Sequence, residues 1–274
     1  MIKRLLAELS PLPLFALVAP KDAARVARRG ARYADGPRGG IDVYAPRTSN
    51  GAAPVAVFFY GGSWESGERR HYRWVARALA ARGFLTLVPD YRLYPEVRYP
   101  DFLEDGAQAV RWAVEHAPDL GGDPGRIVLL GHSAGAYNAA MLALDQRYLQ
   151  AAGVDPGVIR AFAGLSGPYA FLPLESPVTR RTFGEAADLE ATQPGAYAWP
   201  DAPAAFLATG EQDTVVKPRQ TRRLAKALRE AGARVEERYY PGMGHAGPVL
   251  AFSRLFRRKS TLLVDLTAFL KSNV

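Results

Sequence analysis

The chain of 274 residues contains no cysteine, only four histidines and no long uninterrupted apolar run. The absence of cysteine excludes disulfide bonds, thiol catalysis and metal sites with thiolate ligands. It also fits a reducing compartment, so we expect a cytoplasmic protein. Because no internal repeat or low-complexity linker is visible, the sequence predicts a single domain over residues 1–274.

Acidic side chains are fewer than basic ones. The chain has 27 Asp and Glu and 35 Lys and Arg, which gives a formal net charge of +8. A basic protein can bind nucleic acid or anionic membranes. The basic residues are, however, scattered over predicted helix faces, and no nucleic-acid-binding motif is present. We therefore expect an arginine-rich solvated surface and no nucleic-acid partner.

The first thirty residues lack a membrane-spanning segment. The apolar stretch over 5–18 follows Lys3 and Arg4, but an acid, a serine and two prolines make it too short and too broken to span a bilayer. The same interruptions disfavour a cleaved signal peptide, although the basic start is typical of one. We interpret residues 1–30 as an N-terminal helical cap segment that covers the mouth of a site or makes a peripheral contact with a membrane.

Strand patterns alternate with helical patterns along the rest of the chain. The predicted strands are 32–34, 41–44, 55–60, 84–88, 127–130, 158–165, 204–209 and 235–240, and the predicted helices are 68–81, 102–116, 134–144, 218–231 and 250–270. This alternation indicates an α/β fold with a mostly parallel sheet of about eight strands, flanked by helices. Residues 166–200 have weak periodicity and many Pro and Gly, which predicts an irregular insertion that forms a small lid.

Residues 131–135 read Gly-His-Ser-Ala-Gly and directly follow the apolar run over 126–130. A buried strand followed by G-x-S-x-G is typical of a nucleophile elbow, whose sharp turn from strand to helix projects the serine hydroxyl into a pocket. Ser133 is therefore the candidate nucleophile, with small flanking residues because neighbouring chain packs close on either side.

A serine nucleophile needs a base, and the search among four histidines is short. His132 adjoins Ser133, but its side chain is expected to point elsewhere, and His71 and His116 lie inside predicted helices. His245 lies in a glycine-rich loop over 241–247, after the last predicted strand. Because such a loop lets an imidazole reach a site, His245 is the predicted base.

The orienting carboxylate should lie between the serine and the histidine in chain order. Asp213 comes shortly after the strand over 204–209, at the edge of the sheet where ligands meet open α/β folds. Glu211 is a nearby rival, and Asp188 and Asp201 are weaker candidates in or beside the irregular segment. An ionised Asp213 would fix the tautomer of the histidine and stabilise its imidazolium.

The strand over 55–60 leads directly into Gly61-Gly62-Ser63-Trp64. A strand that opens into paired glycines exposes successive backbone N–H groups at the edge of the sheet. Together with the N–H of Ala134, at the start of the helix after the serine, these groups would meet a developing negative charge. The sequence therefore predicts an oxyanion hole beside the elbow.

Four blocks resemble α/β-hydrolases, close to the hormone-sensitive-lipase-like esterases and the kynurenine-formamidase-like group. They are residues 60–64, residues 89–96, the elbow, and the segments around Asp213 and His245. The second block resembles the Asp-Tyr-Arg-Leu-Ala-Pro-Glu stretch of those esterases, and residues 103–105 and 120–124 also resemble them. The resemblance implies an α/β-hydrolase fold, in which Asp90 and Arg92 support the site as scaffold.

By the same resemblance, the oxyanion donors map to Gly62, Ser63 and Ala134, with Gly61 holding the turn. The chain departs from the family pattern at Tyr60, where a histidine usually braces the oxyanion loop. It also has His132 where the lipase branch usually has Asp, which is more like the formamidase and feruloyl-esterase-like branch.

The function favoured by these residues is a serine carboxylesterase that hydrolyses small acyl or aryl esters of short chain length through an acyl-enzyme, without metal or cofactor. Aromatic residues predict an apolar pocket, with Gly61 and Trp64 at the substrate; they are Trp64, Tyr94, Tyr169, Phe171 and Trp199. An arylformamidase that cleaves N-formylkynurenine is the alternative. A non-catalytic ligand-binding relative is a third hypothesis, and monomer and homodimer both stay open.

Overall fold

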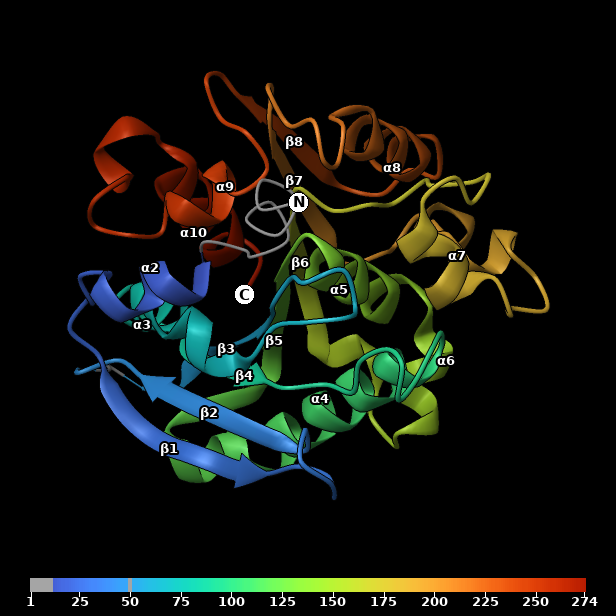
Figure 1. The fold of residues 1–274 in the computed structure, drawn as a ribbon. Helices are drawn as coiled ribbons and strands as arrows, with labels where there is room; N and C mark the ends of the chain where they lie inside the picture. The colour runs from blue at the N-terminus through green and yellow to red at the C-terminus, as the bar shows by residue number, and fades with distance from the viewer. Residues whose placement is uncertain (1–11, 49–50) are drawn as a thin grey trace.

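Eight strands form one sheet in the computed structural model, which describes residues 12–48 and 51–274. The strands are β1 (Arg25–Arg32), β2 (Gly40–Ala45), β3 (Ala53–Phe59), β4 (Leu85–Pro89), β5 (Gly122–His132), β6 (Ile159–Leu165), β7 (Ala204–Gly210) and β8 (Val235–Tyr240). Their spatial order is β1-β2-β4-β3-β5-β6-β7-β8 (Figure 1). The strands from β4 to β8 in this order pair in parallel, whereas β1 and β2 are antiparallel to their neighbours. The prediction of a mostly parallel sheet of about eight strands is confirmed.

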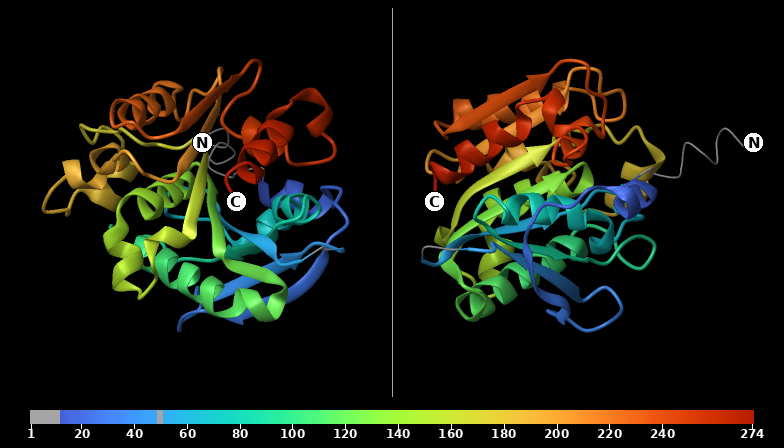
Figure 2. Two further views of the ribbon diagram at one scale, coloured as in Figure 1. Left: turned by 180° about the vertical axis from the view of Figure 1, so that it is seen from behind. Right: turned by 90° about the vertical axis from the view of Figure 1, so that its left-hand side faces the viewer.

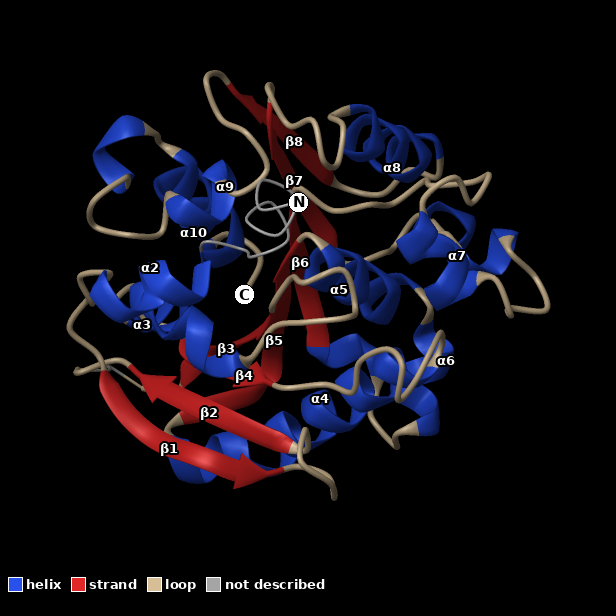
Figure 3. Cartoon of the chain, in the orientation of Figure 1, coloured by secondary structure: helices blue, strands red, loops and turns tan. Residues whose placement is uncertain are grey.

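Helices cover both faces of this sheet (Figure 3). They are α2 (Leu12–Val18), α3 (Arg73–Ala80), α4 (Asp101–Leu120), α5 (Ala134–Leu144), α6 (Gln146–Ala151), α7 (Pro177–Phe183), α8 (Arg219–Glu230), α9 (Gly247–Leu250) and α10 (Leu262–Lys271). Helices α3 and α10 lie on one face, and α4, α5 and α8 lie on the other (Figures 1 and 2). None of the helices in the described ranges is long and apolar enough to cross a membrane.

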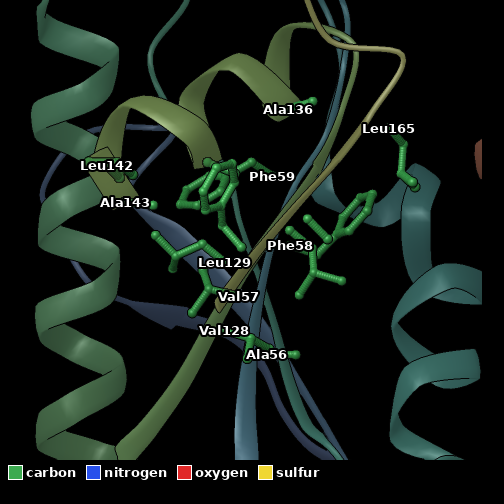
Figure 4. Close-up of a cluster of buried hydrophobic side chains, with 14 of the residues drawn as sticks. Ala56, Val57, Phe58, Phe59, Val128, Leu129, Ala136, Leu142, Ala143 and Leu165 are labelled. Carbon is green, nitrogen blue, oxygen red and sulfur yellow. The ribbon is translucent and has the colours of Figure 1, made fainter. Parts of the chain in front are cut away.

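The core lies on both sides of β3 and β5, the two central strands that lead to the site. Phe58 and Phe59 are fully buried and point to opposite faces, because successive side chains of a strand alternate (Figure 4). Phe59 lies on the side of Leu142 from α5, and Phe58 lies on the side of Leu165. Each such side chain contributes roughly 1.5–3 kcal/mol by burial, which holds the strand ends in place.

The N-terminal region differs from the sequence prediction of a helical cap over 1–30. Residues 1–11 lie outside the described residues. Within the rest, only α2 is helical, while 25–30 belong to β1, which replaces the short strand predicted over 32–34. The expectation is wrong for 25–30, because pairing with β2 imposes a strand on an arginine-rich segment without a buried alternating face.

The predicted closing helix over 250–270 is also wrong, since the structure breaks it into α9, a 3-10 turn at Arg257–Lys259, and α10. Arg257 forms an ion pair with Asp22, and Ser260 is extended and accepts the N–H of Leu262 through its hydroxyl. Leu255, expected on the apolar side, is 55% exposed.

The segment over 166–200 contains only α7 and two 3-10 turns, Glu190–Thr192 and Pro194–Tyr197, as its weak periodicity predicted. It lies against α5, where the hydroxyl of Tyr137 donates to the carbonyl of Thr192 at 2.7 Å. Its role as a lid stays a prediction.

Candidate active site

Ser133 lies at the junction between β5, which ends at His132, and α5, which begins at Ala134. Its backbone has φ 54° and ψ −124°, a conformation that costs a non-glycine residue about 1–3 kcal/mol. The N–H of Ser133 donates to the carbonyl of Leu165 at 2.8 Å and helps to hold this geometry. A Cβ atom at Gly135 would lie 2.1 Å from the carbonyl oxygen of Phe59, so the turn requires glycine there.

The loop after β8 brings His245 to the serine hydroxyl. Its Nε2 lies 2.9 Å from Oγ of Ser133, and its Nδ1 lies 2.9 Å from Oδ2 of Asp213. The loop is tied to β7 by the N–H of Gln212, which donates to the carbonyl of Met243 at 2.9 Å. The structure therefore brings together the three side chains that the sequence singled out, at the carboxyl ends of β5, β7 and β8.

Asp213 is completely buried and fully hydrogen-bonded. Its Oδ1 accepts the N–H groups of Val215 at 3.0 Å and Val216 at 2.8 Å. Burial raises the pKa of Asp213. The hydrogen bond from His245, the charge of the His245 ring and the N–H of Val216 together outweigh burial, and they hold the pKa of Asp213 below its ordinary value. An ionised carboxylate only accepts, so Nδ1 of His245 carries the hydrogen and Nε2 turns its lone pair to Ser133, as a general base requires.

The rival side chains lie elsewhere. Glu211 is exposed, and Asp188 is exposed and accepts the N–H of Glu190 at 2.9 Å. Asp201 is also exposed. His116 stacks on Trp112, with ring centroids 4.3 Å apart.

The loop after β3 turns sharply at the predicted oxyanion donors. Gly62 has φ 141°, and a Cβ atom there would lie 2.1 Å from the carbonyl oxygen of Ser66. Ser63 and Trp64 have φ 56° and 57°, and the N–H of Glu65 closes the turn on the carbonyl of Gly62 at 3.0 Å. Two positive φ values at the central positions are the mark of a type I′ turn.

This loop lies directly against the nucleophile, since a Cβ atom at Gly61 would be 2.9 Å from Cβ of Ser133. Within 12–48 and 51–274, no hydrogen bond engages the N–H groups of Gly62 and Ser63, nor that of Ala134, the first residue of α5. These three groups are free to donate to an anionic oxygen, and their catalytic role stays a prediction.

The structure does not place Trp64 at the substrate, contrary to the sequence prediction. Its side chain is 3% exposed, and its indole N–H donates to Oδ1 of Asn138 at 3.0 Å. Its ring packs edge-on against Phe183 and Tyr137, with centroids 4.9 and 5.3 Å away. Trp64 therefore anchors the oxyanion loop to α5, and its burial offsets the strain of its positive φ.

The other aromatic residues expected at the pocket divide into two groups. Tyr169 is buried in the core, and Tyr94 lies under the guanidinium groups of Arg98 and Arg181. Phe171 and Trp199 are partly buried and belong to the segment over 166–200.

Tyr60 stands in place of the usual bracing histidine and is itself braced. Arg38 donates to the hydroxyl of Tyr60 at 3.2 Å and to the carbonyl of Gly67 at 3.1 Å, and so joins both ends of the oxyanion loop. The hydroxyl of Tyr91 donates to the carbonyl of Tyr60 at 2.7 Å, and the two rings stack at 4.7 Å. Arg38 was missed because its segment is turn-rich and carries no motif.

His132 points elsewhere than to Ser133, as the sequence suggested, and its ring reaches the loop of the base. It is 3% exposed, and its Nε2 lies 3.0 Å from the carbonyl oxygen of His245. Because a carbonyl only accepts, Nε2 of His132 carries a hydrogen. Burial and the neighbouring charge of His245 lower the pKa of His132 to about 3, so the ring stays neutral at working pH.

The side chains of Asp90 and Arg92 are engaged by partners outside the triad, which is what a scaffold role requires. Asp90 accepts the N–H of Arg69 at 2.7 Å and forms an ion pair with its guanidinium. Arg92 forms a two-pronged ion pair with Asp105. Among the residues that the structure describes, no group of three or more His, Asp or Glu could hold a metal ion.

Known proteins resemble this chain in sequence and in fold. The BD-FAE family model matches residues 41–228. The probable isoprenylcysteine alpha-carbonyl methylesterase ICMEL1 of Arabidopsis thaliana is 35% identical over 153 residues, covering 54% of this chain and 32% of that protein. Carboxylesterase NlhH of Mycobacterium tuberculosis is 41% identical over 104 residues, covering 38% and 33%. The chain thus spans about a third of the length of these curated relatives.

The solved structure of an inhibited esterase B from Lactobacillus rhamnosis superposes with a TM-score of 0.82 at 19% identity, covering 99% of this chain and 96% of that one. A truncated carbohydrate esterase from gut microbiota has a TM-score of 0.78 at 20% identity, covering 93% and 98%. At such identities the likeness establishes the fold, and the family match extends over more than half of the chain. The chain belongs to the BD-FAE family of α/β-hydrolases.

Proposed function

We propose that the protein is a serine carboxylesterase. The observation that carries this proposal is the chain of two 2.9 Å contacts from Ser133 through His245 to Asp213. Beside it lie three backbone N–H groups that no residue of the described ranges engages. The esterase names of the relatives support it, although the chain spans only part of their length.

The reaction follows from the positions of these groups. Oγ of Ser133 attacks the acyl carbon of an ester while Nε2 of His245 takes its proton, and ionised Asp213 stabilises the imidazolium that forms. The N–H groups of Gly62, Ser63 and Ala134 bind the oxyanion, each worth roughly 3 kcal/mol in the transition state. His245 then gives its proton to the leaving alcohol, and a water molecule releases the acyl group from Ser133 by the same route.

We propose short acyl or aryl groups as the substrate class. Beside α5, the space between the oxyanion loop and the segment over 166–200 is filled by packed rings. Phe183 lies 4.9 Å from Trp64, 5.4 Å from Tyr137 and 4.8 Å from Phe171, centroid to centroid. A long acyl chain would have to displace these rings. The lack of cysteine supports a cytoplasmic location as part of the same proposal.

The test compares hydrolysis of p-nitrophenyl butyrate, p-nitrophenyl palmitate and N-formylkynurenine by the wild-type chain. We expect the highest kcat/KM on the butyrate ester, and loss of that activity in Ser133→Ala. Ser272→Ala, which changes an exposed serine at the end of α10, is the matched control and should keep full activity. Faster turnover of N-formylkynurenine would make the protein an arylformamidase, and faster turnover of palmitate would contradict the short-chain proposal.

A further inference from the structure

Exposed apolar side chains gather at one place on the surface. Seven large apolar side chains are exposed in the described part of the chain, and four of them belong to α2 or to the segment after α9. They are Leu14, Leu17, Val18 and Leu255, with exposures of 72%, 77%, 71% and 55%. Scattered single apolar residues are ordinary on a surface, whereas a contiguous group marks an interaction site.

The two segments are in contact, which brings the four side chains to the same region of the surface. Phe15 on the inner side of α2 packs at 5.3 Å against Trp74 and at 5.8 Å against Phe256, centroid to centroid. The ion pair between Asp22 and Arg257 joins the same two segments. Helix α2 is therefore docked by its inner face, while Leu14, Leu17 and Val18 lie on its exposed side.

The two segments themselves carry charge of one sign. Residues 12–21 and 246–264 contain no Asp or Glu. Four basic side chains in these segments are exposed: Lys21, Arg254, Arg258 and Lys259. We name the four apolar and four basic side chains the apolar–basic patch. Asp22, at its border, is engaged by Arg257 and leaves the positive charge of the patch in place.

The patch borders the site described above. Helix α9 begins two residues after His245 and leads into the segment that carries Leu255 and Arg258. Helix α2 packs against the 3-10 turn at Arg69–Tyr72, which follows the oxyanion loop. Figure 2 shows α2, in blue, at the edge of the sheet where the parallel strands end.

We propose that the apolar–basic patch docks this protein onto an anionic lipid bilayer surface. Exposed leucines flanked by Lys and Arg are what an interfacial contact requires, because apolar side chains enter the acyl boundary while cations meet anionic headgroups. A second copy of the chain fits this surface poorly. In a two-fold contact the four basic side chains of one copy would face the same four of the other copy and repel them. The residues before α2 also carry a net positive charge, with Lys3 and Arg4 against Glu8.

Docking would turn the side of the protein that carries the loop of His245 toward the membrane. If the proposed function holds, the substrates would include esters that partition into lipid, with the ester group reaching Ser133 at the interface. The lipid contact itself needs no catalysis, so the Ser133→Ala variant should bind vesicles as the wild type does. Failure of the hydrolase proposal and failure of the docking proposal are therefore distinguishable.

The experiment measures cosedimentation of the full chain with vesicles of phosphatidylcholine alone or with about 30% phosphatidylglycerol. We expect binding to the anionic vesicles that weakens as salt rises from about 50 to about 500 mM. The triple variant Leu14→Ser, Leu17→Ser, Val18→Ser should lower the partition coefficient at least about tenfold. The triple variant Arg254→Glu, Arg258→Glu, Lys259→Glu should lower it at least about a hundredfold, since each basic side chain near such a surface is worth about fivefold.

The matched control makes the same change of charge on α8, with Arg219→Glu, Arg223→Glu and Lys226→Glu, all exposed side chains. It should change binding less than about threefold, and the three triple variants should keep wild-type hydrolysis of a soluble ester. Equal loss in the α8 control would mean that net charge alone drives binding, and the patch would be refuted. The docking proposal would also be refuted if the leucine/valine variant and the Arg254/Arg258/Lys259 variant both bound vesicles as the wild type does, or if the wild type did not bind them. A dimer that the leucine variant dissociates would assign the patch to a second copy and overturn the lipid proposal.

Discussion

His132 offers the sharpest perturbation, because one buried ring both holds the base and resists protonation. Its Nε2–H donates to the carbonyl of His245 at 3.0 Å. His132→Leu removes this donor and leaves a buried carbonyl unsatisfied, which costs about 1–3 kcal/mol. If the loop of His245 shifts to relieve this cost, its imidazole leaves the position of the base, and kcat/KM falls about 10- to 100-fold. His132→Gln keeps an N–H donor, so its activity should stay within about fivefold of wild type.

The same ring gives stability a defined dependence on pH. Well above pH 6.5 the ring is neutral in the folded and unfolded states and contributes nothing. Below pH 6.5 the unfolded state binds a proton, whereas the folded state, with its pKa lowered to about 3, does not. The free energy of unfolding therefore falls with pH, by about 2 kcal/mol from this group at pH 5. A glutamine side chain does not titrate. Between pH 7.5 and 5, the free energy of unfolding of His132→Gln should therefore fall by about 2 kcal/mol less than that of wild type.

Urea unfolding of wild type, His132→Gln and His132→Leu at pH 7.5 and 5.0, with kcat/KM on p-nitrophenyl butyrate, measures both effects. A wild-type kcat/KM in the Leu variant would refute the positioning role. An equal loss of unfolding free energy by wild type and the Gln variant on acidification would refute the buried neutral state of His132.

Three further variants probe the parts around the triad. Asp213→Asn should lower kcat about 10³- to 10⁴-fold, because the amide no longer holds the base tautomer of His245, and unchanged kcat would contradict that role. Trp64→Phe keeps an aromatic ring but replaces the indole by a smaller one and leaves Oδ1 of Asn138 without its donor. The free energy of unfolding should therefore drop by at least about 1–3 kcal/mol in urea titration, and an unchanged value would contradict the anchor. Arg38→Ala should lower kcat more than it raises KM, because the oxyanion loop loses its bridge between Tyr60 and Gly67, whereas Arg28→Ala on exposed β1 should leave both unchanged.

The parts of the fold that the sequence predicted share a simple physical basis. Strands covered on both faces need continuous apolar runs, as over 55–60 and 127–130, and their patterns are readable without knowledge of their partners. The elbow and the chain order of Ser133, Asp213 and His245 follow from chemistry that permits few residue types. These features did not depend on which distant residues would pack together.

The parts that the sequence did not predict depend on distant contacts. β1 is a strand because β2 pairs with it, and the break before α10 coincides with the ion pair between Arg257 and Asp22, which lie 235 positions apart. Trp64 looked like a substrate contact because it follows the glycines, yet Asn138 and Phe183 draw it into the core. His132 gave no signal of its direction, since its partner is a backbone carbonyl 113 residues away.

Labelling with a fluorophosphonate probe tests the central claim most directly, because an activated serine reacts with the probe far faster than an ordinary hydroxyl group does. Mass spectrometry of the digested protein should find one adduct, on Ser133, and His245→Ala should slow its formation at least about a hundredfold. An adduct on another residue, or no adduct in a protein that still hydrolyses esters, would contradict the account.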